Sequence, residues 1–191
     1  MRRIGITGGI GSGKSVVSRL LRIMGYSVYD TDSEAKRLME SSLEVVQKLS
    51  ECFGRDIYHN GRLNRGLLSS RVFGKSDKIV LLNSIVHPVV RFDFYRWSES
   101  LNEEICFVES AILYESRFDE LVDEVWTVTA PEELRISRVR QRSGLTEEEI
   151  KKRMAAQLSE EEKQRRAAHI IWNDGNVSVC LLYTSPSPRD S

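Results

Sequence analysis

The sequence predicts an α/β protein in which helices flank a parallel β-sheet. The chain opens with an apolar strand pattern at residues 3–7, a glycine-rich turn, a helical pattern at 14–24 and a second strand pattern at 26–30. Two further buried strand patterns follow at 105–109 and 125–128, each separated from the previous strand by other segments. A strand–helix–strand opening is typical of a parallel sheet, because parallel neighbours need a crossover connection.

The first helix is expected to run from Lys14 to about Met24, where apolar residues recur at helical spacing: Val16, Val17, Leu20 and Leu21. Gly25 is a typical helix stop. From about 38 to 104 the pattern is helical, and one helical stretch ends at 69–73.

Asp77 is the expected N-cap of the next helix in this region, which carries Ile79, Leu81, Leu82, Ile85 and Val86. Pro88 has no backbone N–H and disfavours helix at the residue before it, so a break or kink is predicted near His87.

In the last third, Pro131 suits the first turn of a helix that runs to about Arg142, and Gly144 ends it. Two capping-box patterns predict two further helix starts: Thr146 with Glu149, and Ser159 with Glu162. Residues 169–172 are the last expected strand. Residues 176–191 hold two of the four prolines and are expected to be a disordered or non-native tail.

Composition excludes several classes of protein. The 191 residues carry 28 Lys and Arg against 28 Asp and Glu, and the resulting zero net charge argues against a general nucleic-acid or membrane-surface binder. No apolar run is long enough for a membrane helix, and the N-terminus lacks a signal-peptide pattern, so a cytoplasmic protein is expected. The three cysteines have no CxxC spacing, which predicts reduced, buried thiols: Cys52, Cys106 and Cys180.

Residues 8–15 fit the phosphate-loop pattern G-x-x-x-x-G-K-[ST] at every defined position, between an expected strand and an expected helix. The glycines allow successive N–H groups to turn inward, and the helix N-terminus adds positive partial charge. Lys14 can reach the β- and γ-phosphates, and the hydroxyl of Ser15 can bind Mg²⁺. The loop predicts nucleoside triphosphate binding and leaves the second substrate open.

Two carboxylates, Asp30 and Asp32, follow the second strand. A carboxylate at this edge of a parallel sheet can accept a proton from an acceptor hydroxyl and orient it for in-line attack. The alternative is that one of them caps the following helix. Asp32 is predicted to take part in the chemistry, and Asp30 is predicted to be structural.

The segment 135–142 holds four arginines and no acidic residue: Arg135, Arg138, Arg140 and Arg142. Arg138 and Arg142 are four residues apart and share a helix face. A lid that closes on phosphates needs such guanidinium groups, although a solvated basic helix has the same pattern. Arg138 is the preferred candidate, and Arg153 on the next helix is a weaker one.

Six motifs follow one another along the chain: the loop Thr7–Ser15, Tyr29-Asp-Thr-Asp32, Ile85-Val-His-Pro88, the segment from Val108 to Glu115, the arginines from Arg138 to Arg142, and Ile171-Trp-Asn-Asp-Gly175. In this order and spacing they make the chain resemble the dephospho-coenzyme A kinase family over about residues 1–176. The resemblance implies transfer of the γ-phosphoryl group of ATP to the ribose 3′-hydroxyl of dephospho-coenzyme A. It also implies a P-loop kinase core (1–37, 105–135 and 168–175), a helical substrate-binding insertion (38–104) and a helical lid (136–166).

The resemblance further implies a set of site residues. The catalytic residues would be Asp32, Lys14 and Arg138. ATP would contact Gly9, Ile10, Gly11, Ser12, Gly13, Lys14, Ser15, Val16, Arg142, Asn173 and Gly175, the last two near the adenine. The acceptor would contact Thr7, Asp32, His87, Arg91 and Glu109. Mg²⁺ would bind Ser15. His87 has the alternative interpretation of a structural histidine at a proline kink. A monomer is expected, with an oligomer left open.

Three departures from the family pattern matter. Val16 stands where many members have Thr, which removes one possible hydroxyl contact to a phosphate, and Glu109 stands where an Asp is common. Members usually continue into a final amphipathic helix, whereas residues 179–191 show no such pattern and resemble a translated cloning junction. We expect a missing helix to uncover apolar surface, at a cost of several kcal/mol at roughly 25 cal/mol per Å².

Two other functions stay open at this point. Another small-molecule kinase, acting on a nucleoside monophosphate or a small alcohol, would share the loop and the lid. A nucleotide-dependent switch would share the loop alone, but a GTPase usually needs an Asn-Lys-x-Asp motif, which this sequence lacks.

Overall fold

The computed structural model describes residues 1–175 and divides into two compact units. The first unit contains Met1–Tyr29 and the chain from Leu101 onward, and the second contains Asp30–Ser100. The expected tail at 176–191, and with it Cys180, lies outside the described residues.

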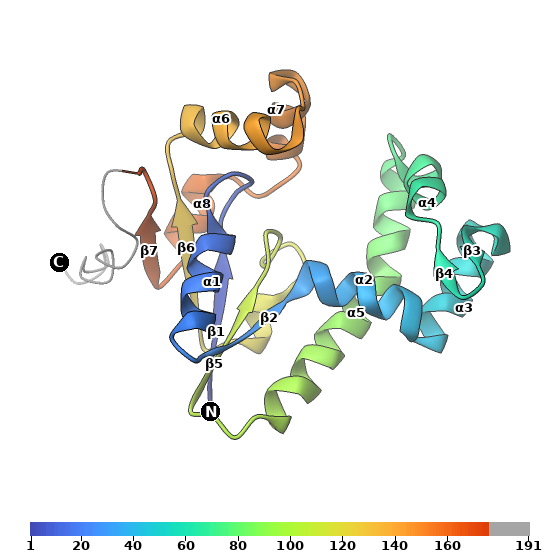
Figure 1. Ribbon diagram of the computed structural model, residues 1–191, viewed down its shortest axis with the longest axis horizontal. Coiled ribbons are helices and arrows are strands. Elements are labelled where there is room, and N and C mark those ends of the chain that lie inside the picture. The colour runs from blue at the N-terminus through green and yellow to red at the C-terminus, as the bar shows by residue number, and fades with distance from the viewer. Residues whose placement is uncertain (176–191) are drawn as a thin grey trace. The chain divides into compact units, whose positions relative to one another are not determined.

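A five-stranded sheet in the order β2-β5-β1-β6-β7 organises the first unit. Its strands are β1 (Arg2–Thr7), β2 (Ser27–Asp30), β5 (Ile105–Glu109), β6 (Glu124–Thr129) and β7 (His169–Trp172). Strand β1 pairs in parallel with both β5 and β6, and β6 pairs in parallel with β7 (Figure 1). The predicted α/β class with a parallel sheet is confirmed.

The core of this unit forms where α1 (Lys14–Ile23) packs against β1 and β5. Val17 and Leu21 of the helix join Ile4 and Ile6 of β1 in one buried cluster, together with Phe107, Trp126, Val128 and Ile171 from the neighbouring strands. Gly5 faces the other side of the sheet, where a Cβ would lie 2.7 Å from the side chain of Leu113. Burial on both faces explains why β1 is apolar throughout rather than alternating.

The described part of the first unit contains three more helices and a short 3₁₀ helix: α6 (Glu132–Ser143), α7 (Glu147–Ala155), α8 (Glu160–Arg166) and η2 (Phe118–Leu121). Both predicted caps are present: Thr146 and Glu149 form the full capping box of α7, and Ser159 accepts from the backbone of Glu162 in α8. Gly144 ends α6 in the left-handed conformation. Pro131 is the N-cap of α6, one position before the expected first turn.

The second unit is mostly helical. Its elements are α2 (Thr31–Ser41), α3 (Leu43–Phe53), η1 (Arg55–Ile57), β3 (Tyr58–His59), β4 (Arg62–Leu63), α4 (Arg65–Val72) and α5 (Ser76–Ser100). The prediction that the pattern from about 38 to 104 is helical is wrong at the β3–β4 hairpin. Its turn, Asn60-Gly61, has positive φ at both residues, which is the geometry that this dipeptide favours in tight hairpins.

Helix α5 corrects two further predictions. Asp77 lies in the first turn rather than at the N-cap, because the helix already begins at Ser76 and Lys75 accepts from the backbone of Ile79. Pro88 lies inside the helix, so the predicted break near His87 is wrong, whereas the alternative of a kink there stays a prediction. The missing N–H deprives the helix of one hydrogen bond, and packing of α5 on α2, α3 and α4 offsets that loss.

The cysteines meet the prediction in part. Among residues 1–175 neither Cys106 nor Cys52 has a disulfide partner. Cys106 is buried in β5, and burial raises the pKa of its thiol to about 11. Cys52 is exposed on α3, so the expectation of buried thiols is wrong for this residue. Within residues 1–175, no helix combines the length and the apolar character that a membrane span requires.

Candidate active site

The phosphate loop connects the end of β1 to the start of α1. Gly13 is the N-cap of α1 in the left-handed conformation, with φ of 95°, and Gly11 has φ of 82°. The backbone N–H of Ser12 donates to the carbonyl of Gly9 at 3.1 Å, which closes the turn. Positive φ at these two positions lets the backbone curve around an anion, and the N-terminus of α1 points at the same place.

The predicted nucleotide ligands from Gly9 to Val16 therefore lie on one continuous turn. Within it, the Lys14 ammonium donates to the carbonyl of Gly8 at 2.9 Å, which folds the side chain back over the loop. Ser15 and Val16 are exposed in the first turn of α1. An accessible hydroxyl beside bound phosphates suits Mg²⁺, which takes few protein ligands and keeps several waters.

The other side of the loop is packed tightly by side-chain and backbone atoms from distant segments. A Cβ on Gly9 would lie 2.2 Å from Glu160 Oε1, and a Cβ on Gly11 would lie 2.4 Å from the carbonyl of Arg135. A Cβ on Gly8 would lie 2.1 Å from the carbonyl oxygen of Val128. The glycines are therefore required by close approach as well as by backbone conformation.

Gly13→Ala is expected to abolish most nucleotide binding. The new Cβ would lie 2.0 Å from Asn173 Nδ2, and alanine is strained at this φ. Titration with ATP measures the loss, and Gly74→Ala is a matched control because Gly74 has φ of 75° with nothing within 4 Å of a Cβ. Equal ATP affinity in the Gly13 variant and the wild type would contradict this close packing.

Asn173 connects the loop to the arginine-rich helix. Its side-chain amide donates to the carbonyl of Ser12 at 2.9 Å, and its Oδ1 accepts from Arg138 Nη2 at 3.5 Å. The Nη1 of Arg138 is buried and has no hydrogen-bond partner within residues 1–175. Asn173 and Arg138, which are candidates from separate motifs, thus lie together at the loop.

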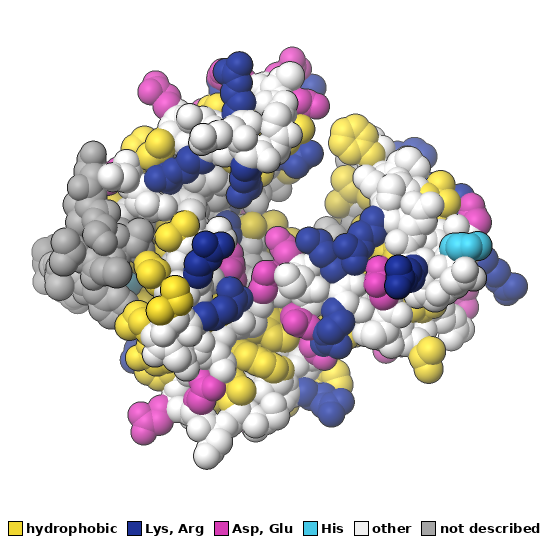
Figure 2. Space-filling model, viewed as in Figure 1, with side chains coloured by type: hydrophobic (Ala, Val, Ile, Leu, Met, Phe, Trp, Pro, Cys, Tyr) yellow, Lys and Arg dark blue, Asp and Glu magenta, His cyan; other side chains and the backbone are white. Residues whose placement is uncertain are grey.

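The remaining candidates on the same side are exposed. Arg142 lies in the last turn of α6, and Gly175 follows β7 with φ of 88°. Figure 2 shows several Lys and Arg side chains over α6 and α7, interspersed with acidic ones. Arg153, the weaker candidate, lies on α7 and is also exposed.

Arg135 occupies a different environment from the other three arginines of its segment. Its side chain is only 5% exposed, and its Nε donates to the carbonyl of Ile10 at 3.1 Å. Glu160 is its ion-pair partner at 3.4 Å. The backbone N–H of Ile10 donates to Gln157 Oε1 at 3.0 Å. Sequence reasoning missed Gln157 and Glu160, and only the capping box beside Glu160 drew attention to that segment.

Lys163 is the second buried cation of this region. Its side chain is 0% exposed, and its Nζ lies 3.9 Å from Glu160 Oε1. Burial lowers the pKa of the Lys163 ammonium. The charges of Glu160 and Glu115 act in the opposite direction, and the charge of Arg135 lowers the pKa of Lys163 further. A charged helical residue rarely becomes fully buried, so nothing in the local pattern around Lys163 predicted this position.

Two acceptor-side candidates lie at strand ends of the first unit. Glu109 is the last residue of β5 and pairs in register with Ile6, one residue before Thr7. Thr7 is fully buried, and its hydroxyl has no hydrogen-bond partner in the described part of the chain. Both side chains therefore belong to the carboxyl edge of the sheet, where open α/β sheets bind ligands.

The other acceptor-side candidates belong to the second unit. Asp30 caps α2, since its Oδ1 accepts from the backbone of Asp32 at 3.0 Å and of Ser33 at 3.3 Å. The structural role predicted for Asp30 is confirmed. Asp32 is the second residue of α2 and is exposed.

His87 and Arg91 lie one turn apart on α5 and are both half-buried. Burial, and then the charge of Arg91, lowers the pKa of His87. A neutral imidazole beside a guanidinium is therefore favoured near neutral pH.

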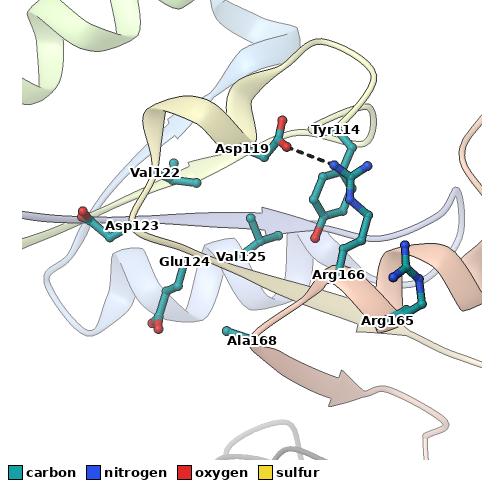
Figure 3. Close-up of a pocket in the computed structure, with 9 residues that line it drawn as sticks. All are labelled: Tyr114, Asp119, Val122, Asp123, Glu124, Val125, Arg165, Arg166 and Ala168. Atoms are coloured by element: carbon teal, nitrogen blue, oxygen red, sulfur yellow. Dashed lines mark hydrogen bonds and ion pairs between the residues drawn. The ribbon is translucent and has the colours of Figure 1, made fainter. Parts of the chain in front are cut away.

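A hollow of about 540 Å³ lies elsewhere in the first unit, beside the start of β6. In Figure 3 the side chain of Arg166 lies along the ring of Tyr114 and reaches Asp119. The Cζ of Arg166 is 4.2 Å from the centroid of the Tyr114 ring. Its Nη2 donates to the carboxylate of Asp119 at 3.2 Å. The phosphate loop follows the opposite, carboxyl ends of the parallel strands. This hollow is therefore separate from the candidate active site.

No group of three or more His, Cys, Asp or Glu side chains in residues 1–175 is arranged to hold a metal ion.

Comparison with known proteins agrees with this geometry. A sequence model described as Dephospho-CoA kinase matches residues 2–178. A Dephospho-CoA kinase of Porphyromonas gingivalis is 44% identical over 174 residues, which cover 91% of this chain and 86% of the relative. A crystal structure of a Thermus thermophilus protein is 38% identical, with a TM-score of 0.79, and covers 92% of this chain and 90% of that one. A Dephospho-CoA kinase structure from Campylobacter jejuni is 25% identical with a TM-score of 0.69 over the same shares.

Proposed function

The chain belongs to the dephospho-CoA kinase family, and from that premise we propose that it transfers the γ-phosphoryl group of ATP to the ribose 3′-hydroxyl of dephospho-CoA. This reaction is the last step of coenzyme A synthesis. The observation that carries the proposal is the complete phosphate loop at the N-terminus of α1, with its left-handed glycines and Lys14 folded over it. We propose that the enzyme works in the cytoplasm as a monomer.

Asp32 is the proposed general base. Its carboxylate accepts the proton of the 3′-hydroxyl, the hydroxyl oxygen forms a bond to the γ-phosphorus, and the bond to the β–γ bridging oxygen breaks to release ADP. Since Asp30 supplies the cap of α2, the Asp32 carboxylate does not have to satisfy the helix terminus.

Lys14, Arg138 and Arg142 are the proposed cations for the triphosphate. The buried Nη1 of Arg138, which has no hydrogen-bond partner among the described residues, supports this role, because a phosphate oxygen would satisfy a donor that is otherwise costly to bury. The exposed hydroxyl of Ser15 would hold Mg²⁺, which neutralises charge on the phosphate oxygens. Asn173 and Gly175 are proposed to lie near the adenine.

The acceptor is proposed to contact Thr7 and Glu109 at the sheet edge and His87 and Arg91 on α5. In this assignment the helical substrate-binding insertion spans 38–104, the lid spans 136–166, and the core spans 1–37, 105–135 and 168–175. The unpartnered hydroxyl of Thr7 supports its place, since a substrate oxygen would give it a partner.

An acceptor panel tests the reaction. ADP release from ATP is measured with dephospho-CoA, nucleoside monophosphates and shikimate as separate acceptors. Release is expected with dephospho-CoA alone, and mass spectrometry of the product should show one added phosphoryl group. ADP release confined to another acceptor would refute the proposal.

A further inference from the structure

The peptide groups on either side of Ile10 are held by two residues that are far away in the sequence. The Ile10 N–H donates to Gln157 Oε1 at 3.0 Å, and the Ile10 carbonyl accepts from Arg135 Nε at 3.1 Å. Gln157 follows α7, and Arg135 lies in the first turns of α6. The two contacts therefore join both flanks of the α6–α7 segment to one residue of the phosphate loop.

Because peptide groups are planar, these two contacts also fix the directions of the neighbouring N–H groups of the loop. In a trans peptide the C=O and the next N–H point in opposite directions. Because the Ile10 carbonyl is directed at Arg135, the N–H of Gly11 is directed away from Arg135. The Gly9 carbonyl accepts from Ser12, and so the Ile10 N–H is directed outward, to Gln157. The N–H of Ile10 is thus occupied by Gln157, and the N–H of Gly11 is directed away from the side of the loop that Arg135 covers.

The buried guanidinium of Arg135 is paired with a carboxylate, which it shares with the buried ammonium of Lys163. Glu160 Oε1 lies 3.4 Å from Arg135 Nη1, and Glu160 Oε2 accepts from Thr129 Oγ1 at 3.3 Å. Lys163 Nζ lies 3.9 Å from the same carboxylate. A buried guanidinium with an ion pair and a carbonyl acceptor is held in one geometry, which suits a fixed support better than a mobile phosphate ligand.

We propose that Arg135 and Gln157 form a clamp on Ile10 that sets the orientation of the phosphate-loop peptides and ties the loop to the helix bearing Arg138 and Arg142. Both are positioning residues, and Ile10 contributes to nucleotide binding through this clamp rather than through its own N–H. The inference rests only on the nucleotide-binding half of the proposed function.

Two substitutions at Gln157 separate a positioning role from simple packing. Gln157→Glu keeps an acceptor oxygen for the Ile10 N–H, whereas Gln157→Leu keeps most of the volume and removes the acceptor. The leucine variant is expected to weaken ATP binding about three- to tenfold, the range for one neutral hydrogen bond. The glutamate variant is expected to stay close to the wild type. Direct titration of the full chain with ATP measures both.

Comparing the KM for ATP with the KM for dephospho-CoA provides a second readout. In Gln157→Leu the KM for ATP is expected to rise while the KM for dephospho-CoA and the melting temperature stay close to the wild-type values. Arg135→Lys keeps a positive charge beside Glu160 but removes the guanidinium fork, and it is expected to shift ATP affinity in the same direction. Lys152→Gln, an exposed change on α7, serves as the control.

The outcomes are distinct. Wild-type ATP affinity in Gln157→Leu would overturn the clamp, as would an equal loss in the leucine and glutamate variants. A lower melting temperature with unchanged ATP affinity would show that Gln157 only supports the fold and would also overturn it. Phosphorylation of a different acceptor would refute the proposed function and leave the clamp standing, because the ATP titration requires no acceptor.

Discussion

Asp32→Asn is expected to lower the turnover of dephospho-CoA by at least about 100-fold, the usual contribution of a positioned general base. The amide has nearly the same shape as the carboxylate but does not take up the hydroxyl proton. ATP binding should remain near the wild-type value, because the phosphate loop belongs to a different part of the chain. Steady-state kinetics with both substrates, and ATP titration of the same preparation, measure the two effects.

The helix that carries Asp32 should survive this substitution. The N-cap hydrogen bonds of α2 are made by the side chain of Asp30, which accepts from the backbone of Asp32 and Ser33. Asp77→Asn is the matched control, since Asp77 also lies exposed in the first turn of a helix of the second unit. Near-normal turnover in Asp32→Asn would remove Asp32 from the base role.

Local signals predicted the parts of the fold that depend on short stretches of chain. The strand–loop–helix opening, the cap of α7 and the glycine after α6 each involve residues within a few positions of one another. The hairpin at Asn60-Gly61 was also a local signal, but its strands are two residues each, too short to show an alternating pattern. Pro88 indicated a break that the helix does not have, because packing of the whole of α5 outweighed the local preference of proline against a helix.

The candidate site likewise has one part that a local motif predicts and another that only the fold brings together. The phosphate loop is one continuous segment, so its motif was sufficient to find it. The buried state of Arg135 depends on Ile10, 125 residues earlier, and the contact of Gln157 with Ile10 spans 147 residues. Sequence spacing grouped Arg135 with three other arginines of α6, and only the folded chain separates the buried support from the candidates for phosphate binding.

Lys14→Ala is expected to lower kcat by about 100- to 1,000-fold, the usual effect of removing one preorganised donor to a developing negative charge. The Lys14 ammonium donates to the carbonyl of Gly8 at 2.9 Å, so it is already held over the loop before any phosphate arrives. The loss should be larger in kcat than in ATP affinity, because the backbone donors of the loop remain. Rapid-quench measurement of the phosphoryl-transfer step, together with ATP titration, separates the two quantities.

Arg19→Ala is the control for this variant, because Arg19 is an exposed cation on the same helix. If kcat fell equally in the two variants, the effect would come from the overall charge of α1 rather than from the position of Lys14. An unchanged kcat together with an unchanged ATP affinity in Lys14→Ala would count against the phosphate-loop assignment itself. A loss confined to ATP affinity would mean that the Lys14 ammonium binds the ground state and the transition state equally, so that other groups stabilise the charge of the transition state.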